Sequence, residues 1–238
     1  MRILPLSAAL LVAPTATDPN PPTGIPRARP IGDVRPVAAL TPAFQLVEHT
    51  GPSRVLAEKF IHKRFADAFG ARIEAFMPRL FCMYNADVEL CGALGLRSAR
   101  HRLYLEHYLE QPIEATIAQD TGATVERSSI MEVGHLSGAF PGAMRTLIWL
   151  LADRLAREGY EWVAFTGTVE LRNAFRRNGL DPIDVGAAKR ERLPKEVRSA
   201  WGSYYDHAPR VFVGRVQDGV RSMQVLAGES DARSGSMA

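Results

Sequence analysis

Residues 125–142 read VERSSIMEVGHLSGAFPG, and their pattern changes from that of a strand to that of a turn before a helix. The run 125–136 is rich in β-branched and apolar residues, which is typical of a long strand, and Gly138 and Gly142 end it. Residues 143–157 follow as an amphipathic helix, because their apolar side chains recur every three or four positions. These side chains are Leu147, Ile148, Leu151 and Leu155. The pattern predicts one strand-helix unit of an α/β sheet.

A second unit follows downstream. Residues 161–165 (EWVAF) indicate a short buried strand, and residues 170–177 indicate a helix that ends at Asn178-Gly179. The run 211–216 (VFVGRV) predicts a last strand. Because a helix joins the strands 125–136 and 161–165, we expect these two strands to pair in parallel.

The upstream half predicts further elements of both kinds. They are a strand over 44–49, a helix over 53–69, a hairpin of strands 78–84 and 88–96 joined by Asn85-Ala86-Asp87, and short helices over 104–109 and 113–119. Taken together, the order predicts an α/β fold with a mixed central sheet and helices on both faces.

The two ends of the chain differ from this middle part. Nine of the 16 prolines lie at or before Pro42, so residues 1–42 are expected to be a disordered, proline-rich leader. Residues 43–219 form the predicted domain, and residues 220–238 are expected to be a flexible tail. Residues 1–13 hold one Arg and an interrupted apolar run, so secretion is an alternative to the expected cytoplasmic location.

Composition excludes several classes of protein. A net charge of +3 without a gathered basic face does not indicate nucleic-acid binding. No run approaches the eighteen or so apolar residues of a transmembrane helix. Cys82 and Cys91 are nine positions apart and the histidines are scattered, so we expect neither a metal site nor a permanently bound cofactor.

Six blocks, in order, resemble the thermostable hemolysin family between about residues 71 and 219. They are LGLRSA (94–99), LYLEHYLEQPIE (103–114), ERSSIMEVGHLSG (126–138), WVAFTGT (162–168), LRNAFRRNGL (171–180) and WGSYYDHAPRV (201–211). That family is distantly similar to the N-acetyltransferase (GNAT) and acyl-homoserine-lactone synthase scaffold. The resemblance implies a GNAT-like acyl-CoA N-acyltransferase fold.

The same resemblance implies an activity and a donor site. The protein would move an acyl group from acyl-CoA or from the pantetheine of an acyl carrier protein to an amine-bearing small molecule. The pantetheine arm would lie in a V-shaped cleft where two neighbouring strands splay apart, against Val133, Gly134, Leu136, Gly138, Gly142, Ala143 and Thr166. The glycines permit close approach of the backbone, and the following helix favours an anion at its N-terminus. The alternative is a plain glycine-rich turn into a core helix.

Three residues are candidates for the chemistry. Glu132 could act as the base or bind the amine, and His135 lies three positions further along the same strand. Their side chains point to opposite faces unless the chain bulges at Gly134. In the related scaffold Asn173 could protonate or orient the leaving sulfur. The alternative for Glu132 is a structural hydrogen bond.

A further group could recognise the substrate. Glu106 and Arg127 either bind a substrate carboxylate or amine, or form an ion pair that holds helix to sheet. Tyr104 could contact substrate or cover the core. Tyr204 and Tyr205 could line an acyl or acceptor pocket, or form an aromatic lid over the sheet.

Residues 189–198 gather positive charge at Lys189, Arg190 and Arg192, with Lys195 and Arg198 following. Such a run is either a solvated helix face or a docking surface for an acidic acyl carrier protein. Two other functions remain open for the chain as a whole. One is direct action on lipid, which would need a membrane-active element, and the other is non-catalytic binding of a ligand or carrier protein.

Overall fold

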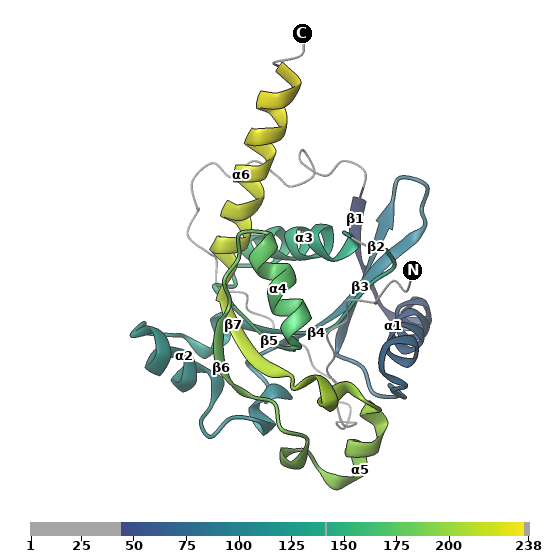
Figure 1. The fold of residues 1–238 in the computed structure, drawn as a ribbon, viewed down its shortest axis with the longest axis vertical. Helices are drawn as coiled ribbons and strands as arrows, with labels where there is room; N and C mark the ends of the chain where they lie inside the picture. The colour runs from purple at the N-terminus through teal and green to yellow at the C-terminus, as the bar shows by residue number, and fades with distance from the viewer. Residues whose placement is uncertain (1–43, 141, 236–238) are drawn as a thin grey trace.

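The computed structural model describes residues 44–140 and 142–235, without the side chains of residues 226–235. The expected leader over 1–42 therefore lies outside the described residues. Within the described ranges, seven strands form one sheet in the order β1-β2-β3-β4-β5-β7-β6 (Figure 1). The strands are β1 (Phe44–His49), β2 (Arg79–Asn85), β3 (Leu90–Ser98), β4 (Ile130–Gly138), β5 (Trp162–Gly167), β6 (Ile183–Ala187) and β7 (Arg210–Arg215).

The sheet is mixed. The strands β4 and β5 pair in parallel, as expected for strands that a helix connects, and the other neighbours pair antiparallel. The helices are α1 (Arg54–Phe69), α2 (Ile113–Thr121), α3 (Ala143–Arg157), α4 (Val169–Arg177), α5 (Lys195–Arg198) and α6 (Val216–Gly235). In the described ranges, no helix is both long and apolar enough to cross a membrane.

Two apolar cores lie on opposite faces of the sheet. On one face, α1 and α2 pack through residues such as Phe65 and Ile117 against Trp162 of β5. On the other face, α3 packs through Leu147 against Phe165 of β5, together with α4 and the start of α6. Alternate side chains of one strand thus serve different cores, as the two-residue repeat of a strand requires. The predicted α/β sheet with helices on both faces is confirmed.

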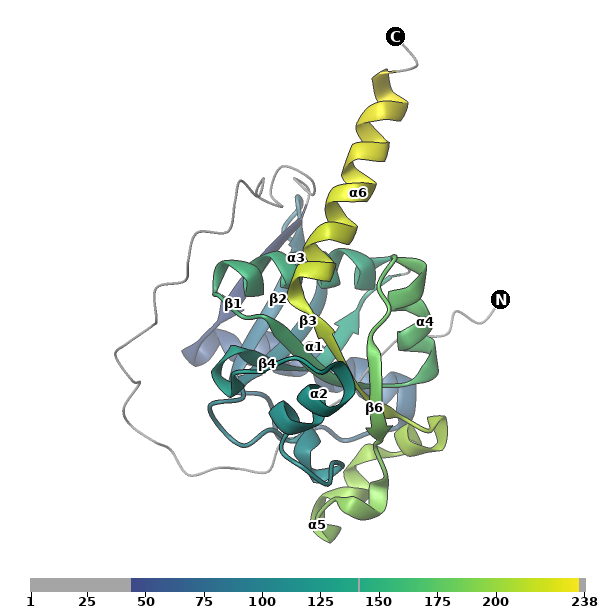
Figure 2. The same cartoon turned by 90° about the vertical axis from the view of Figure 1, so that its left-hand side faces the viewer.

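Three elements differ from the sequence expectation. The helix expected over residues 104–109 is a single 3-10 turn at Leu105–His107. The sequence did not predict β6, which has five residues and includes a register shift between Asp184 and Gly186. The chain was expected to become a flexible tail at residue 220, but α6 continues to Gly235 (Figures 1 and 2). Val216, Val220 and Met223 of this helix are buried in the core beside α3, and this contact explains why the helix forms.

Candidate functional site

A β-bulge in β4 shapes the centre of the sheet. Across the β3–β4 pair, Ala93 faces Ser137 and Gly95 faces Gly134, so β4 has one more residue than β3 over this stretch. The extra residue brings His135 into the left-handed region, with φ 55°. The expectation that Gly134 bulges is therefore correct in effect, although His135 is the residue that adopts the unusual conformation. As a result Glu132 and His135 face the same core, beneath α1.

Beyond the bulge, β4 and β5 separate. Their parallel register ends at the pair Val133 and Phe165, yet β4 continues to Gly138 and β5 continues to Gly167. The backbone groups of β4 that face β5 past Val133 consequently have no partner strand in this register. Such a gap offers backbone N–H and C=O groups to a ligand.

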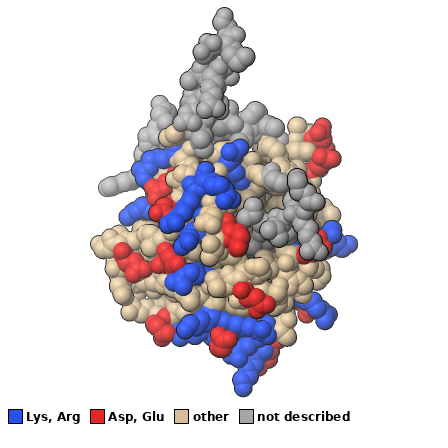
Figure 3. Space-filling model, viewed as in Figure 1, with Lys and Arg blue, Asp and Glu red and all other residues tan. Residues whose placement is uncertain are grey.

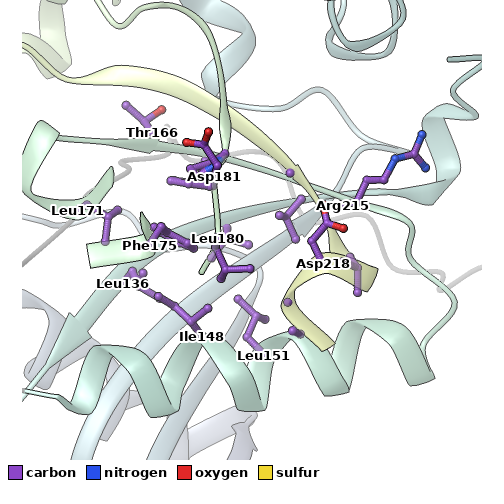
Figure 4. Close-up of a pocket in the computed structure, with 18 of the residues that line it drawn as sticks. Leu136, Ile148, Leu151, Thr166, Leu171, Phe175, Leu180, Asp181, Arg215 and Asp218 are labelled. Atoms are coloured by element: carbon purple, nitrogen blue, oxygen red, sulfur yellow. The ribbon is translucent and has the colours of Figure 1, made fainter. Parts of the chain in front are cut away.

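A cleft opens at this gap, on the face of the sheet that α3 and α4 cover (Figure 4). The empty space of the cleft is about 760 Å³, including open solvent at its mouth. Residues from the first turn of α6 also line it. Only some of the residues predicted to contact the donor line this cleft. Those that line the cleft are Val133, Gly134, Leu136 and Thr166.

The remaining predicted donor contacts, Gly138, Gly142 and Ala143, do not line the cleft as described. A Cβ atom on Gly138 would meet the Cβ atom of Ala143 at 3.2 Å, so the strand end packs directly on α3. Gly142 caps α3 with φ 96°, and the Ala143 side chain is fully buried. This arrangement agrees with the alternative prediction for this segment, which was a plain glycine-rich turn that leads into a core helix.

Thr166 supplies an unusual polar group at the gap. Its side chain is 2% exposed, and its hydroxyl has no hydrogen-bond partner in the part of the chain that the structure describes. Phe165 faces α3 and α4, so strand alternation turns Thr166 toward the opposite face. Because Thr166 also lines the cleft, it lies where the cleft meets the gap between the two strands. A buried donor without a partner is costly unless a ligand satisfies it.

Glu132 does not line the cleft. Its side chain is completely buried, and its two carboxylate oxygens accept hydrogen bonds from the backbone N–H groups of Tyr104 (3.0 Å) and Leu105 (2.8 Å). Burial raises the pKa of Glu132 to about 7, although the two backbone N–H groups act in the opposite direction. The carboxyl group therefore ties residues 104–105 to β4. This placement corrects the expectation that Glu132 meets the substrate as a base.

His135 and Asn173 also lie away from the cleft. The Nε2 atom of His135 accepts a hydrogen bond from the backbone N–H of Met77 at 3.1 Å, and its ring packs against Phe65 and Phe76. Burial lowers the pKa of His135 to about 3, so its imidazole is neutral. Asn173 is exposed, on the side of α4 opposite its buried residues. The deep burial and neutral imidazole of His135 conflict with its predicted catalytic role, whereas the predicted role of Asn173 stays a prediction.

The pair Glu106 and Arg127 has the structural role that was the alternative prediction. Arg127 donates to both carboxylate oxygens of Glu106, at 2.7 and 3.0 Å, and to Glu114 at 2.5 Å. Glu106 also accepts the backbone N–H groups of Leu103 and Ile113. With its oxygens engaged in this way, Glu106 holds α2 and the preceding loop to the start of β4, and its substrate role is not supported.

The aromatic residues that were predicted to contact the substrate belong to one cluster on the face of the sheet that α1 covers. Tyr104 and Tyr204 are buried, and both rings pack against Trp201. The hydroxyls of Tyr108 and Tyr205 are 2.6 Å apart. None of these side chains is among the residues that line the cleft as described, so they build the core of the α1 face.

The predicted basic surface is exposed at the end of the domain where α5 lies (Figure 3). Arg192 pairs with Glu110 at 2.5 Å and donates to the carbonyl oxygen of Leu109 at 2.7 Å. Arg192 therefore fastens residues 190–192 to the body of the domain. Lys189 and Arg190 remain exposed beside it.

Sequence reasoning missed the residues that form most of the cleft wall. Leu171 and Phe175 lie four positions apart on α4, and this spacing could have indicated an apolar face. Val216 and Gly219 come from α6, for which no helix was expected. Leu180 lies in the connection from α4 to β6 and carries no periodic signal.

Comparison with solved structures supports this fold. The structure of TofI in an apo form superposes with a TM-score of 0.53 at 14% identity, covering 76% of this chain and 96% of TofI. FeeM, an N-acyl amino acid synthase from uncultured soil microbes, gives a TM-score of 0.51 at 14% identity, covering 74% of this chain and 92% of FeeM. The AHL synthase LasI gives 0.49 at 10% identity, covering 73% and 89%.

The likenesses to TofI and FeeM confirm the expected α/β fold with a mixed sheet. No curated protein matches the sequence. The model of one protein family does match it, over residues 47–220, which include every described strand except the start of β1. The family is thermostable hemolysin, and this chain belongs to it.

Proposed function

We propose that this protein is an acyltransferase. It would take an acyl group from an acyl thioester, carried by coenzyme A or by an acyl carrier protein, and transfer it to an amine-bearing small molecule. The observation that carries the proposal is the gap between β4 and β5, where an apolar cleft meets unpaired backbone and the buried hydroxyl of Thr166. A thioester needs this combination: apolar walls and a few directed donors.

The proposed reaction needs no oxidant or metal. The amine nitrogen attacks the thioester carbonyl carbon, the C–S bond breaks, and the thiol leaves with the proton that the amine gives up. Charge develops on the carbonyl oxygen during the attack, and a fixed donor close to that oxygen lowers the barrier. The Thr166 hydroxyl and the free N–H groups of β4 past Val133 are the candidates for this donor.

The acceptor also needs an accessible acid-base group, and Glu132 and His135 are too deeply buried to provide one. Glu170 begins α4 and His207 precedes β7, and both are exposed at the carboxyl end of β5. Hydrogen bonding with the Thr168 hydroxyl, and to a smaller degree the charge of His207, lower the pKa of the Glu170 carboxyl. Ligands of open α/β sheets bind outside the carboxyl ends of strands, so we assign this pair to the acceptor amine.

A carrier-protein donor is the finer part of the proposal. Residues 187–191, 205–206 and 208–210 line one hollow, so the exposed Lys189 and Arg190 lie close to the segment that holds His207, although His207 itself does not line the hollow. An acidic carrier protein that docked here would bring its arm to the carboxyl end of the sheet. Such docking would speed encounter and weaken as salt increases.

The test uses the full chain with a panel of acyl-coenzyme A and acyl-carrier-protein donors. Release of free thiol is followed with and without pooled amines, and products are identified by mass. Two neighbouring residues of α3 give a matched pair: Leu151 lines the cleft and Leu150 does not, while their side chains are 6% and 8% exposed. We expect Leu151→Phe to lower turnover at least tenfold, and Leu150→Phe to leave turnover per folded molecule close to wild type.

Other outcomes would contradict the proposal. Dye release from pure lipid vesicles without any thioester, together with no thiol release, would favour direct action on lipid. Binding of acyl thioesters without turnover for any acceptor would favour a non-catalytic ligand-binding module. Equal loss of turnover in Leu150→Phe and Leu151→Phe would show that the cleft has no special role.

A further inference from the structure

The cleft has two ends of different character. At the gap between the strands lies Thr166, and at the opposite end, toward solvent, lie Arg215 and Asp218 (Figure 4). The guanidinium of Arg215 lies over the ring of Trp162, 4.4 Å from its centroid. Between the two ends the wall consists of apolar side chains from α3, α4 and β5, including Ile148, Leu151 and Phe175, together with Asp181 (Figure 4).

This apolar wall decides which part of an acyl thioester can lie inside. A pantetheine arm carries two amide groups, and each loses free energy when it is buried without a hydrogen-bond partner. Between the gap and the charged outer end, Asp181 has the one polar side chain of the described wall, and its carboxylate already accepts a hydrogen bond from Arg176. An aliphatic chain needs no partner and gains free energy for each methylene removed from water. The wall therefore fits the acyl chain better than the arm.

The first turn of α6 lies at the outer end of the cleft, where Val216 follows Arg215 in the chain. Val216 lines the cleft and is 3% exposed, and its backbone N–H donates to the carbonyl oxygen of Glu161 at 2.9 Å. One turn later a Cβ atom on Gly219 would meet the Cβ atom of Ala152 at 2.7 Å, so α6 is packed as closely on α3 as its backbone allows. Val216 is thus held in place by two independent contacts of its helix. Past it, a chain would reach charged side chains and water.

We propose that the cleft holds the aliphatic chain of a medium- or long-chain acyl group, and that Val216 in the first turn of α6 limits the length of that chain. The inference deepens the proposed function and rests on it. It names the donor as a fatty-acyl thioester rather than an acetyl thioester. It also gives α6 a part in substrate selection that the family resemblance did not suggest.

Binding of neutral probes tests this without any turnover. Primary alcohols from butanol to dodecanol are titrated into the full chain by calorimetry, since an alcohol avoids the cost of burying a carboxylate. We expect the dissociation constant to fall roughly fourfold for each added methylene until the chain reaches Val216, and then to level off. Coenzyme A alone should not displace a bound alcohol.

Two valines on α6 form a matched pair that tests whether Val216 sets the limit on chain length. Val216 and Val220 are 3% and 1% exposed and lie one turn apart, but only Val216 lines the cleft. Val216→Ala should move the levelling-off point outward by about one or two methylenes, because two methyl groups are removed. Val220→Ala should leave that point unchanged.

The outcomes separate this inference from the proposed function. Affinity that does not depend on chain length, or an equal response of both valine variants, would overturn the inference even if acetyl-coenzyme A proved to be a good donor. Chain-dependent binding that Val216→Ala shifts would support the inference. It would do so even if no donor and acceptor gave turnover, a result that would overturn the proposed function alone.

Discussion

The buried carboxyl of Glu132 makes the free energy of unfolding depend on pH in a direction that can be tested. Burial raises its pKa to about 7 in the folded protein, against 4.5 for an ordinary glutamate. Between these two pH values the folded chain keeps a proton that the unfolded chain has released. The stabilising contribution is therefore fully present below about pH 4.5 and is lost as the pH rises through about 7.

The size of the effect follows from the two pKa values. The difference of about 2.5 between the two pKa values corresponds to about 3–4 kcal/mol. Glu132→Gln keeps the shape of the side chain but cannot titrate. Its amide nitrogen would face one of the two backbone N–H donors, so the variant loses a hydrogen bond at every pH, at a cost of about 1–3 kcal/mol. We expect the stability difference between wild type and variant to shrink as the pH rises from 5 to 8.

Urea titrations at pH 5, 6, 7 and 8 and constant ionic strength measure this difference, provided that the slope of unfolding free energy against urea stays the same. Glu106→Gln is the control. Burial acts to raise the pKa of Glu106, but hydrogen bonds from Arg127 and the backbone outweigh it and lower the pKa below 4.5. The Glu106 contribution is therefore present throughout pH 5–8 and is lost only as the pH falls further. A Glu132→Gln difference that stays constant or widens with pH would refute the reasoning.

Three more predictions concern the gap and its supports. Thr166→Val should lower kcat for thiol release by about tenfold or more with little change in melting temperature, since it removes a donor and keeps the shape; an unchanged kcat would exclude the hydroxyl from the reaction. Arg127→Met should lower the unfolding free energy by about 1–3 kcal/mol in urea titrations, because Glu106 and Glu114 lose their partner while still partly solvated. His207→Gln should lower kcat/KM for the acceptor while the donor KM is unchanged; equal loss for donor and acceptor would contradict the acceptor assignment.

The helices and strands that could be predicted are those whose own residues show a clear helix, strand or turn pattern. The strand over residues 44–49 was predicted with the bounds that β1 has, and the hairpin of β2 and β3 follows from its turn residues. The five residues of β6 include Asp184 and Gly186, which suppress strand propensity, so only pairing with β7 makes them a strand. The sequence after residue 220 is rich in small and polar residues, and α6 depends on burying Val220 and Met223 beside α3.

The candidate site was harder to predict because the type of a residue does not determine which way its side chain points in the fold. Glu132 has the chemistry of a base, but tertiary structure brings two backbone N–H groups to its carboxylate and removes it from solvent. Whether His135 shares its face depends on the register between β3 and β4, which no local pattern in β4 reveals. Thr166 lines the cleft, and its predicted contact with the donor, which came from the family resemblance, stays a prediction.

The bulge in β4 links the buried polar residues to the cleft. The extra residue ends the pairing of β4 with β5 after Val133, and it also turns His135 into the core, where Met77 donates to its imidazole. Gly95 faces the bulge from β3, and a Cβ atom there would meet the Cβ atom of Met77 at 2.5 Å. A left-handed conformation at a residue with a side chain costs roughly 1–2 kcal/mol, and the Met77 hydrogen bond together with the packing of Phe65 and Phe76 offsets that cost. His135 thus belongs to the bulge and to the core of the α1 face, and it does not line the cleft.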